Sequence, residues 1–280
     1  MKWWPAPAKL NLYLHVTGRR ADGYHELSTA FQFLDFGDRL AFSPREDGQI
    51  RLLDPTPGVA IADDLIVRAA RALNAAAGSD FGADVRVEKH IPPGGGLGGG
   101  SSDAATTLVA LNALWGLGLA RERLEAIALT LGADVPVFVA GHAAHATGVG
   151  ERLTPAAFPE PWYVVVHPGI GVSTGEIFAA PELTRASPPA KIPLFSLAEA
   201  RNDCEPVVGS RYPEVARALD WLRARGPGLL TGTGSCVFTW REERAQAAAL
   251  AAGVPTPWRA ILARGCNRSP LAGMESSVGA

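Results

Sequence analysis

The sequence predicts a mixed α+β fold in two domains, and three features support this prediction. Residues 9–16 alternate between apolar and other side chains, as in a strand with one buried face. Residues 92–103 are rich in glycine and lead directly into an apolar pattern with helical spacing. Residues 154–161 include three prolines, which is typical of a domain boundary. We therefore expect a first domain at residues 1–155, a second at residues 156–271 and a disordered tail at residues 272–280.

The spacing of apolar residues places the other elements of the first domain. In the first strand, one face carries Leu10, Leu12, Leu14 and Val16, and the other carries Lys9, Asn11, Tyr13 and His15. Strand-like runs follow at residues 30–35, 39–43, 50–53 and 85–90. We expect helices from residue 65, after Asp63 and Asp64, from the end of the glycine-rich stretch, and at residues 122–131.

The second half of the chain also alternates between strands and helices. Strand-like runs occur at residues 163–167, 229–231, 237–240 and 260–263, and helical patterns at residues 213–224 and 242–252. Strands with helices on one face form an α+β domain.

Composition argues against several classes of protein. The chain has 280 residues, 47% of them hydrophobic, and a net charge of −2, whereas nucleic-acid-binding proteins usually show a basic excess. No apolar run approaches the roughly 20 residues that span a bilayer, and the N-terminus lacks the apolar stretch of a signal peptide. Cys204, Cys236 and Cys266 form no metal pattern. We expect free thiols and a cytoplasmic location.

The glycine-rich stretch is the most informative motif. Six glycines and two serines lie within residues 94–102, and such a sequence exposes backbone N–H groups without side chains in the way. At the start of a helix these donors and the helix dipole favour an anion, most often phosphate. Ser101 and Ser102 are expected as N-cap residues, with Asp103 in the first turn. A flexible linker is the alternative, but the stretch joins a strand to a helix.

Three well-known phosphate loops do not match this stretch. A Walker loop requires a lysine near its end, and none lies near Gly100. Gly94, Gly96 and Gly99 meet the dinucleotide spacing, but the acidic residues about twenty positions later lie in a helical pattern. The glycine loop of protein kinases joins two strands, whereas this one begins a helix. An oxidoreductase with a dinucleotide site is therefore disfavoured.

The stretch resembles the phosphate loop of the GHMP family of small-molecule kinases, Pro-x-x-x-Gly-Leu-Gly-x-x-Ser-Ser. The matching residues are Pro92, Gly96, Leu97, Gly98, Ser101 and Ser102, and the resemblance extends to about residue 271. It implies a ribosomal-protein-S5-like N-terminal domain, a ferredoxin-like C-terminal domain and a site between them. It further implies ATP with Mg²⁺ as cofactors. The implied ATP-binding residues are Pro92, Pro93, Gly94, Gly95, Gly96, Leu97, Gly98, Gly99, Gly100, Ser101 and Ser102.

Four further motifs resemble one branch of that family. They lie at residues 7–12, 20–25, 131–136 and 230–235, in the order that this branch shows. Its members phosphorylate a hydroxyl of a cytidine-diphosphate-linked methylerythritol in the non-mevalonate route to isoprenoid precursors. The resemblance therefore implies a small-molecule substrate and no nucleic-acid or membrane partner. Kinases of the homoserine or mevalonate type, and a non-catalytic nucleotide-binding module, remain alternatives.

Asp134 and Lys9 are the catalytic candidates. An isolated aspartate between a glycine helix stop at Gly132 and Pro136 most often caps or turns the chain, and a lysine on a strand face is most often solvated. The resemblance instead makes Asp134 the base that accepts the hydroxyl proton. It places Lys9 beside Asp134, where a positive charge keeps the carboxylate ionised.

The resemblance also assigns residues to the substrate. Tyr24 and Phe178 would stack on the cytosine and His25 would hydrogen-bond its edge, although a lone Tyr-His pair is more often packing or surface. Asn11 and Thr174 are implied as further contacts.

Three further features concern the nucleotide and its metal ion. The loop at residues 232–235 is by itself most often a tight turn, and in the family it closes over the phosphates. Asp64 stands where the branch has an asparagine beside adenine, although Ile66 and Val67 could still line an apolar adenine pocket. Ser102 could reach Mg²⁺, but no metal ligand is assigned.

Overall fold

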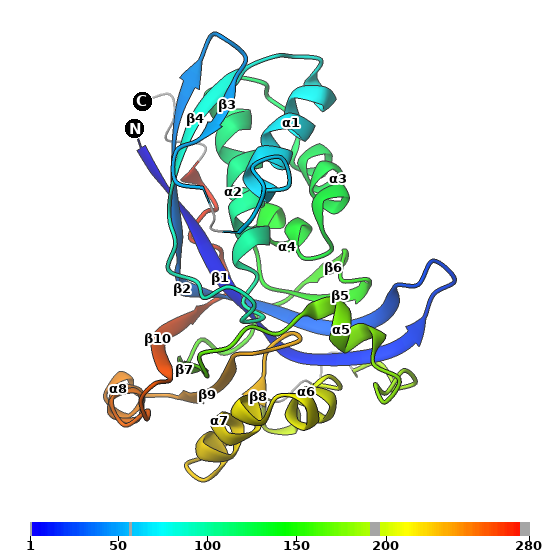
Figure 1. Ribbon diagram of the computed structural model, residues 1–280, viewed down its shortest axis with the longest axis vertical. Coiled ribbons are helices and arrows are strands. Elements are labelled where there is room, and N and C mark those ends of the chain that lie inside the picture. The colour runs from blue at the N-terminus through cyan, green and yellow to red at the C-terminus, as the bar shows by residue number, and fades with distance from the viewer. Residues whose placement is uncertain (1, 56–57, 191–196, 275–280) are drawn as a thin grey trace.

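The computed structural model describes residues 2–55, 58–190 and 197–274, and confirms the mixed α+β class. Ten strands of the described chain are joined in one hydrogen-bonded sheet, in the order β3-β4-β2-β10-β7-β9-β8 with β1, β5 and β6 attached beside it. Figure 1 shows helices α1 to α4 gathered on one side of the upper strands, α6 and α7 at the bottom of the molecule and α8 at the left-hand end of the lower strands. None of the helices in these ranges is long and apolar enough to cross a membrane.

Two long strands form the backbone of the fold. β1 (Lys2–Arg19) and β2 (His25–Arg45) pair antiparallel along their length, so β2 joins two strands that the sequence analysis predicted separately. β-Bulges interrupt the register, one of them between Asn11 and Tyr13. Because a bulge adds one residue to the strand, side chains beyond it change faces. The strict alternation predicted for residues 9–16 is therefore wrong: Tyr13 packs with Leu10 and Leu12, whereas Leu14 belongs to another cluster.

The first half of the chain adds short strands and four helices. Their bounds are β3 Ile50–Leu52, α1 Leu65–Ala77, β4 Gly82–Glu88, α2 Gly99–Leu114, α3 Arg121–Leu131, α4 Val135–Ala140, β5 Ala144–Gly148 and β6 Arg152–Pro155. The Asp64 carboxylate accepts a hydrogen bond from the Ile66 N–H at 2.9 Å and so caps α1.

Helix α2 begins earlier than the sequence analysis predicted. Gly98, in the left-handed region with φ +73°, is its N-cap residue, and no side chain caps the helix. Ser101 and Ser102 are therefore in the first turn, and their prediction as N-cap residues is wrong. A glycine at the cap leaves the first N–H groups of the helix free of side-chain partners.

The second half contributes the lower strands and their helices. Their bounds are β7 Trp162–His167, α5 Thr174–Ala179, a 3₁₀ turn at Leu197–Glu199, α6 Glu205–Arg211, α7 Pro213–Arg223, β8 Leu229–Leu230, β9 Val237–Arg241, α8 Arg244–Ala252 and β10 Arg259–Cys266. β10 pairs with β7 along its length and reaches β2 through Gly265 and Cys266. The last strand thus joins the two halves of the molecule. The division at residues 155 and 156 stays a prediction.

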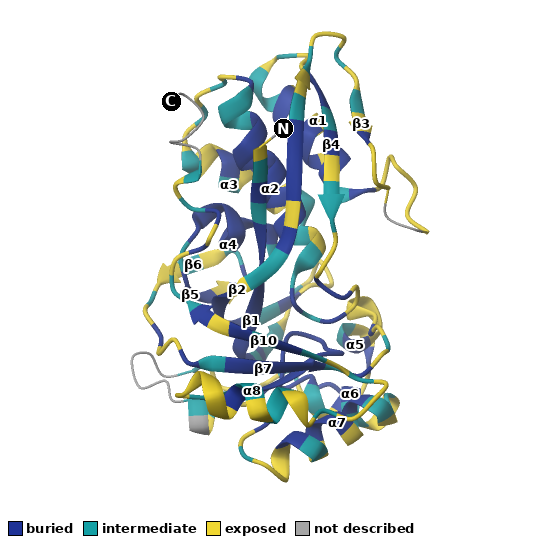
Figure 2. Ribbon diagram, turned by 90° about the vertical axis from the view of Figure 1, so that its left-hand side faces the viewer, coloured by how far each residue is buried: buried dark blue, intermediate teal, exposed yellow. Residues whose placement is uncertain are grey.

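The described residues form three buried clusters, and Figure 2 shows the buried stretches of the chain in dark blue. One lies under α1 to α4, and a second lies among β7, β9 and α5 to α8 with Leu14 and Val16. The third combines residues of β1 and β2 with residues of β7, β9 and β10, so the halves share a core.

Two smaller predictions concern the cysteines and the C-terminus. Cys204, Cys236 and Cys266 are free thiols, as predicted. Of the predicted tail, residues 275–280 lie outside the described residues. Residues 272–274 are hydrogen-bonded to the preceding turn, with Met274 packed on the first cluster.

Candidate active site

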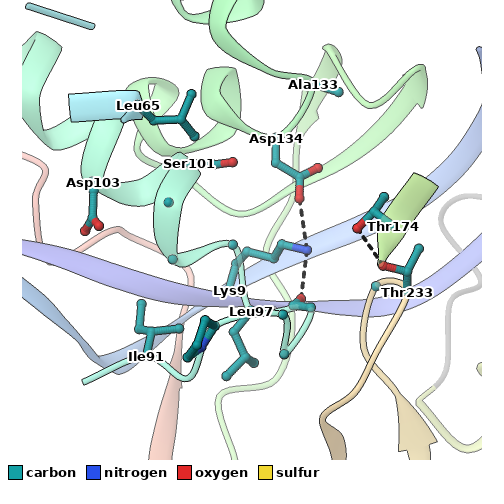
Figure 3. A pocket seen from close by; sticks show the side chains of 18 of the residues that line it. Lys9, Leu65, Ile91, Leu97, Ser101, Asp103, Ala133, Asp134, Thr174 and Thr233 are labelled. Carbon is teal, nitrogen blue, oxygen red and sulfur yellow. Dashed lines mark hydrogen bonds and ion pairs between the residues drawn. The ribbon is translucent and has the colours of Figure 1, made fainter. Parts of the chain in front are cut away.

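A cavity of about 570 Å³ lies where β1, the glycine loop, the start of α2 and the start of α4 meet. Residues from both halves line it, because α5 and the loop after β8 reach it from below (Figures 1 and 3). Most of the predicted site residues are in its lining: Lys9, Asn11, Pro92, Pro93, Gly94, Gly95, Gly96, Leu97, Gly98, Gly99, Gly100, Ser101, Asp134, Thr174 and Phe178. Tyr24, His25 and Ser102 are not.

Lys9 is held at the floor of the cavity by three oxygen atoms. Its Nζ donates to Asn11 Oδ1 at 2.5 Å and to the Gly96 carbonyl oxygen at 3.1 Å, and it lies 3.2 Å from Asp134 Oδ2 (Figure 3). Two of the three N–H donors of the ammonium group are used in these hydrogen bonds, and its charge is paired with the Asp134 carboxylate. The side chain is only 3% exposed. Lys9 is therefore a fixed positive charge aimed at one carboxylate.

Asp134 occupies a helix N-cap position without acting as a cap. It directly precedes α4, but no helix N–H donates to its side chain. The side chain is 36% exposed, against 3% for Lys9, so one end of this ion pair is open to the cavity. The carboxylate is therefore available to a molecule in the cavity while Lys9 holds its orientation.

Asn11 is fixed by residues far apart in the sequence. Its Nδ2 donates to Thr29 Oγ1 at 2.8 Å, and its backbone N–H donates to Thr231 Oγ1 at 2.9 Å. Because Nδ2 is taken by Thr29, Oδ1 faces the ammonium of Lys9. Thr29 and Thr231 are buried, and the sequence analysis identified neither as a site residue.

The glycine loop fits its place because it lacks side chains. A Cβ on Gly96, which has φ +74°, would overlap the carbonyl oxygen of Thr231 and lie 3.0 Å from that of Gly234. A Cβ on Gly98 would lie 2.8 Å from the Phe138 ring and 3.1 Å from Lys9 Cε. These close contacts bring the loop against both the catalytic lysine candidate and the loop after β8.

A charge cluster, Asp38–Lys89–Asp103, in which both carboxylates are buried, holds the two ends of the glycine loop together. Lys89 Nζ lies 2.5 Å from Asp38 Oδ2 and 2.6 Å from Asp103 Oδ2. Asp38 Oδ1 also accepts the backbone N–H groups of His90 and Ile91. Burial, opposed by Lys89 and reinforced by Asp38, raises the pKa of Asp103 to about 7. Asp103 was predicted in the first turn of the helix, whereas neither Lys89 nor Asp38 was predicted from the sequence to belong to the site.

Some of the residues predicted to bind the substrate lie close to one another at the cavity, and one does not. Thr174 Oγ1 and Thr233 Oγ1 are 2.9 Å apart across the lower rim of the cavity (Figure 3). Phe178 lines the cavity and stacks on the ring of His25, with ring centroids 5.2 Å apart. Tyr24 is 62% exposed and is not brought against this pair.

The end of the cavity near α1 is largely apolar. Val59, Leu65, Ile66 and Ile91 line it, together with Asp63 and Asp64. Ile66 is in this lining as predicted, whereas Val67 is not and packs in the first buried cluster. At this end of the cavity Asp64 Oδ1 accepts a hydrogen bond from the Ile66 backbone N–H, so the carboxylate has a role in capping the helix.

Comparison with known proteins identifies the class. Two family models match: "GHMP kinases N terminal domain" over residues 64–142 and "GHMP kinases C terminal" over residues 191–260. The chain belongs to the GHMP kinase family. It is 56% identical over 271 residues to the 4-diphosphocytidyl-2-C-methyl-D-erythritol kinase of Halorhodospira halophila, covering 96% of this chain and 94% of the relative. The enzyme of that name from Nitrosococcus oceani is 55% identical over 271 residues, with 97% of each chain covered.

Solved structures agree with this assignment. A crystal structure of 4-(cytidine 5'-diphospho)-2C-methyl-D-erythritol kinase is similar with a TM-score of 0.82 and 37% identity, covering 94% of this chain and 99% of the other. A mevalonate kinase structure has a TM-score of 0.68 at 13% identity, covering 96% and 100% of the two chains. The second similarity shows the shared fold alone.

Proposed function

We propose that this ATP-dependent small-molecule kinase transfers the γ-phosphate of ATP to a hydroxyl of 4-diphosphocytidyl-2-C-methyl-D-erythritol, giving its 2-phosphate. Relatives of that name match the chain over nearly its whole length. The observation that carries the chemistry is the Lys9–Asp134 pair, 3.2 Å apart in a cavity bordered by the glycine loop and the start of α2.

In this proposal Asp134 accepts the proton of the substrate hydroxyl. Phosphoryl transfer needs mainly positioning, charge stabilisation and a group that takes this proton. The part of Asp134 open to the cavity receives the hydroxyl, and Lys9, 3.2 Å away, keeps the carboxylate oriented. Asn11, fixed by two threonines, hydrogen-bonds the same end of the substrate.

The glycine loop and the start of α2 hold the phosphates. The N–H groups of Gly99, Gly100 and Ser101 precede the first intrahelical bond, which runs from the Ser102 N–H to the Gly98 carbonyl oxygen. These donors and the helix dipole stabilise the negative charge of the phosphates. The adenine lies at the apolar end beside Ile66, and the cytosine is recognised near His25 and Phe178, with Tyr24 on its other face.

The residues present fit a magnesium ion carried by ATP. Mg²⁺ is usually bound by one or two protein ligands together with substrate phosphates and water. The Ser102 hydroxyl, in the first turn of α2, is buried and has no hydrogen-bond partner. We propose that, with ATP bound, the Ser102 hydroxyl would turn to hold the ion, which would supply neutralisation of phosphate charge. No group of three His, Cys, Asp or Glu residues in the described ranges forms a cage of its own.

The test is a coupled ADP-release assay with ATP and Mg²⁺. The acceptors are the cytidine-diphosphate methylerythritol, mevalonate and homoserine, each with wild-type protein and with Asp134→Asn. We expect turnover with the cytidine substrate alone, and a loss of about 10²–10⁴ in kcat for Asp134→Asn, the usual contribution of a general base. Asp220→Asn, on the exposed face of α7, is the matched control and should keep wild-type activity.

The other outcomes separate the alternatives. Turnover only with mevalonate or homoserine would support the assignment as a kinase and refute the assignment of the cytidine compound as its substrate. ATP binding without turnover on any acceptor would favour a non-catalytic nucleotide-binding module. Full activity of Asp134→Asn would remove Asp134 as the base.

A further inference from the structure

An arginine that no motif identified holds the imidazole of His25. Arg185, in the turn that follows α5, donates from Nε to His25 Nε2 at 3.0 Å. The rest of its guanidinium donates to backbone carbonyl oxygens, including those of Phe178 at 3.1 Å, Ala180 at 2.6 Å and Leu183 at 3.0 Å. Arg185 therefore joins the end of α5, which carries Phe178, to the ring of His25.

This contact determines where His25 carries its proton. A guanidinium has only donors and stays protonated, so His25 Nε2 must accept with a lone pair. A neutral imidazole carries one proton, which is then on Nδ1. Burial lowers the pKa of His25, and the charges of Arg185 and of Arg19, its neighbour in the β1–β2 register, lower it further. The doubly protonated ring is thus disfavoured, and Nδ1 is a donor.

The donor at Nδ1 has no protein acceptor among the hydrogen bonds of the described residues. The ring of Phe178 lies against His25, stacked at 5.2 Å with an interplanar angle of 27°. A donor held beside an aromatic face suits a planar base whose edge presents an acceptor. Cytosine has an unprotonated N3, whereas uracil has an N3–H that would face the Nδ1–H donor to donor.

We propose that Arg185 is a positioning residue that makes the site select cytosine over uracil, by fixing the proton of His25 on Nδ1. The inference rests on the proposed function, because it takes His25 to face the base. Arg185 does not touch the base itself. It sets the tautomer of His25 and, through the carbonyl oxygen of Phe178, the position of the stacking ring.

The first experiment compares cytidine- and uridine-diphosphate methylerythritol as acceptors for the wild type, Arg185→Met and Arg185→Lys. We expect the wild type to prefer the cytidine substrate strongly. In Arg185→Met the preference should fall about 10- to 100-fold, the effect of losing one hydrogen bond to a charged group. The preference should fall because the KM for the cytidine substrate rises, while kcat and the KM for ATP stay nearly unchanged. Arg185→Lys keeps a cationic donor and should restore part of the preference.

Arg211→Met is the matched control. Arg211 also binds the α5 region, through Glu182 at 2.7 Å, but does not contact His25. Its variant should keep the wild-type preference. An equal loss of preference in both arginine variants would attribute the effect to the stability of α5 and overturn the proposal.

The second experiment does not depend on turnover. ¹⁵N chemical shifts of the His25 ring in the substrate-free protein distinguish a protonated Nδ1 from a protonated Nε2. We expect the Nδ1–H form in the wild type and a mixture of the two in Arg185→Met, with the pKa of His25 moved upward by loss of a nearby positive charge. A wild-type ring protonated on Nε2 would refute the inference even if the kinase reaction is correct. Absence of turnover with the cytidine substrate, with the Nδ1–H form observed, would instead refute the proposed function.

Discussion

Gly96 offers the most direct test of how the glycine loop is built. Its left-handed backbone, φ +74°, costs an L-residue about 1–2 kcal/mol. A Cβ there would also overlap the Thr231 carbonyl oxygen and crowd that of Gly234, and overpacking of this kind typically costs about 1–3 kcal/mol. We therefore expect Gly96→Ala to lower the free energy of unfolding by about 2–5 kcal/mol.

Gly116→Ala separates the two contributions. Gly116 has nearly the same backbone, φ +65°, but an added Cβ would meet nothing within 4 Å, and the residue lies outside the cavity. Only the cost of the left-handed backbone applies, about 1–2 kcal/mol. At roughly 2–4 °C per kcal/mol, Gly96→Ala should melt roughly 2–12 °C below Gly116→Ala.

The assay is thermal unfolding of both variants, followed by kcat/KM for ATP. Gly116→Ala should keep its kcat/KM, whereas Gly96→Ala should lose more than about tenfold, because a displaced loop misplaces the phosphate donors. If the two variants have the same Tm and the same kcat/KM, the close approach of Gly96 to Thr231 is not a constraint on the loop.

Three further predictions use other parts of the molecule. Lys9→Met should lower kcat about 10²–10³-fold, the usual cost of one charge-stabilising group; a kcat near wild type in ADP-release assays would contradict its role beside Asp134. Burial lowers the pKa of His145, so the unfolded state takes up the proton first as the pH falls below about 6.5. Urea unfolding at pH 7.5 and pH 5 should therefore show a smaller loss of stability for His145→Gln than for the wild type, and an equal loss would contradict the burial argument. Leu73→Ala, at a fully buried position on α1, should cost about 2–5 kcal/mol in urea unfolding while kcat stays unchanged; a cost below about 1 kcal/mol would show that the surrounding side chains collapse into the space that the leucine leaves.

The sequence alone was enough to predict those elements whose signal lies within a short stretch of the chain. Apolar spacing predicted α3 and α7 to within two residues of their observed bounds, and the start of α1 at residue 65, because their buried faces repeat with the helical period. The glycine-rich run predicted an anion-binding helix start, since only glycines admit such close backbone contacts. Asp134 and Lys9 were identified through family motifs, and the fold brings them to 3.2 Å.

Tertiary structure decided the features that depend on residues distant in the chain. The bulge after Asn11 turned Tyr13 into the core, because the pairing of β1 with β2 sets the register. α4 to α6 were missed because they are only six or seven residues long and are stabilised by packing more than by local pattern. Arg185 contacts His25 across 160 positions, and Lys89 contacts Asp38 across 51. Sequence spacing carries no sign of such contacts, because they arise only when separate elements are packed against one another.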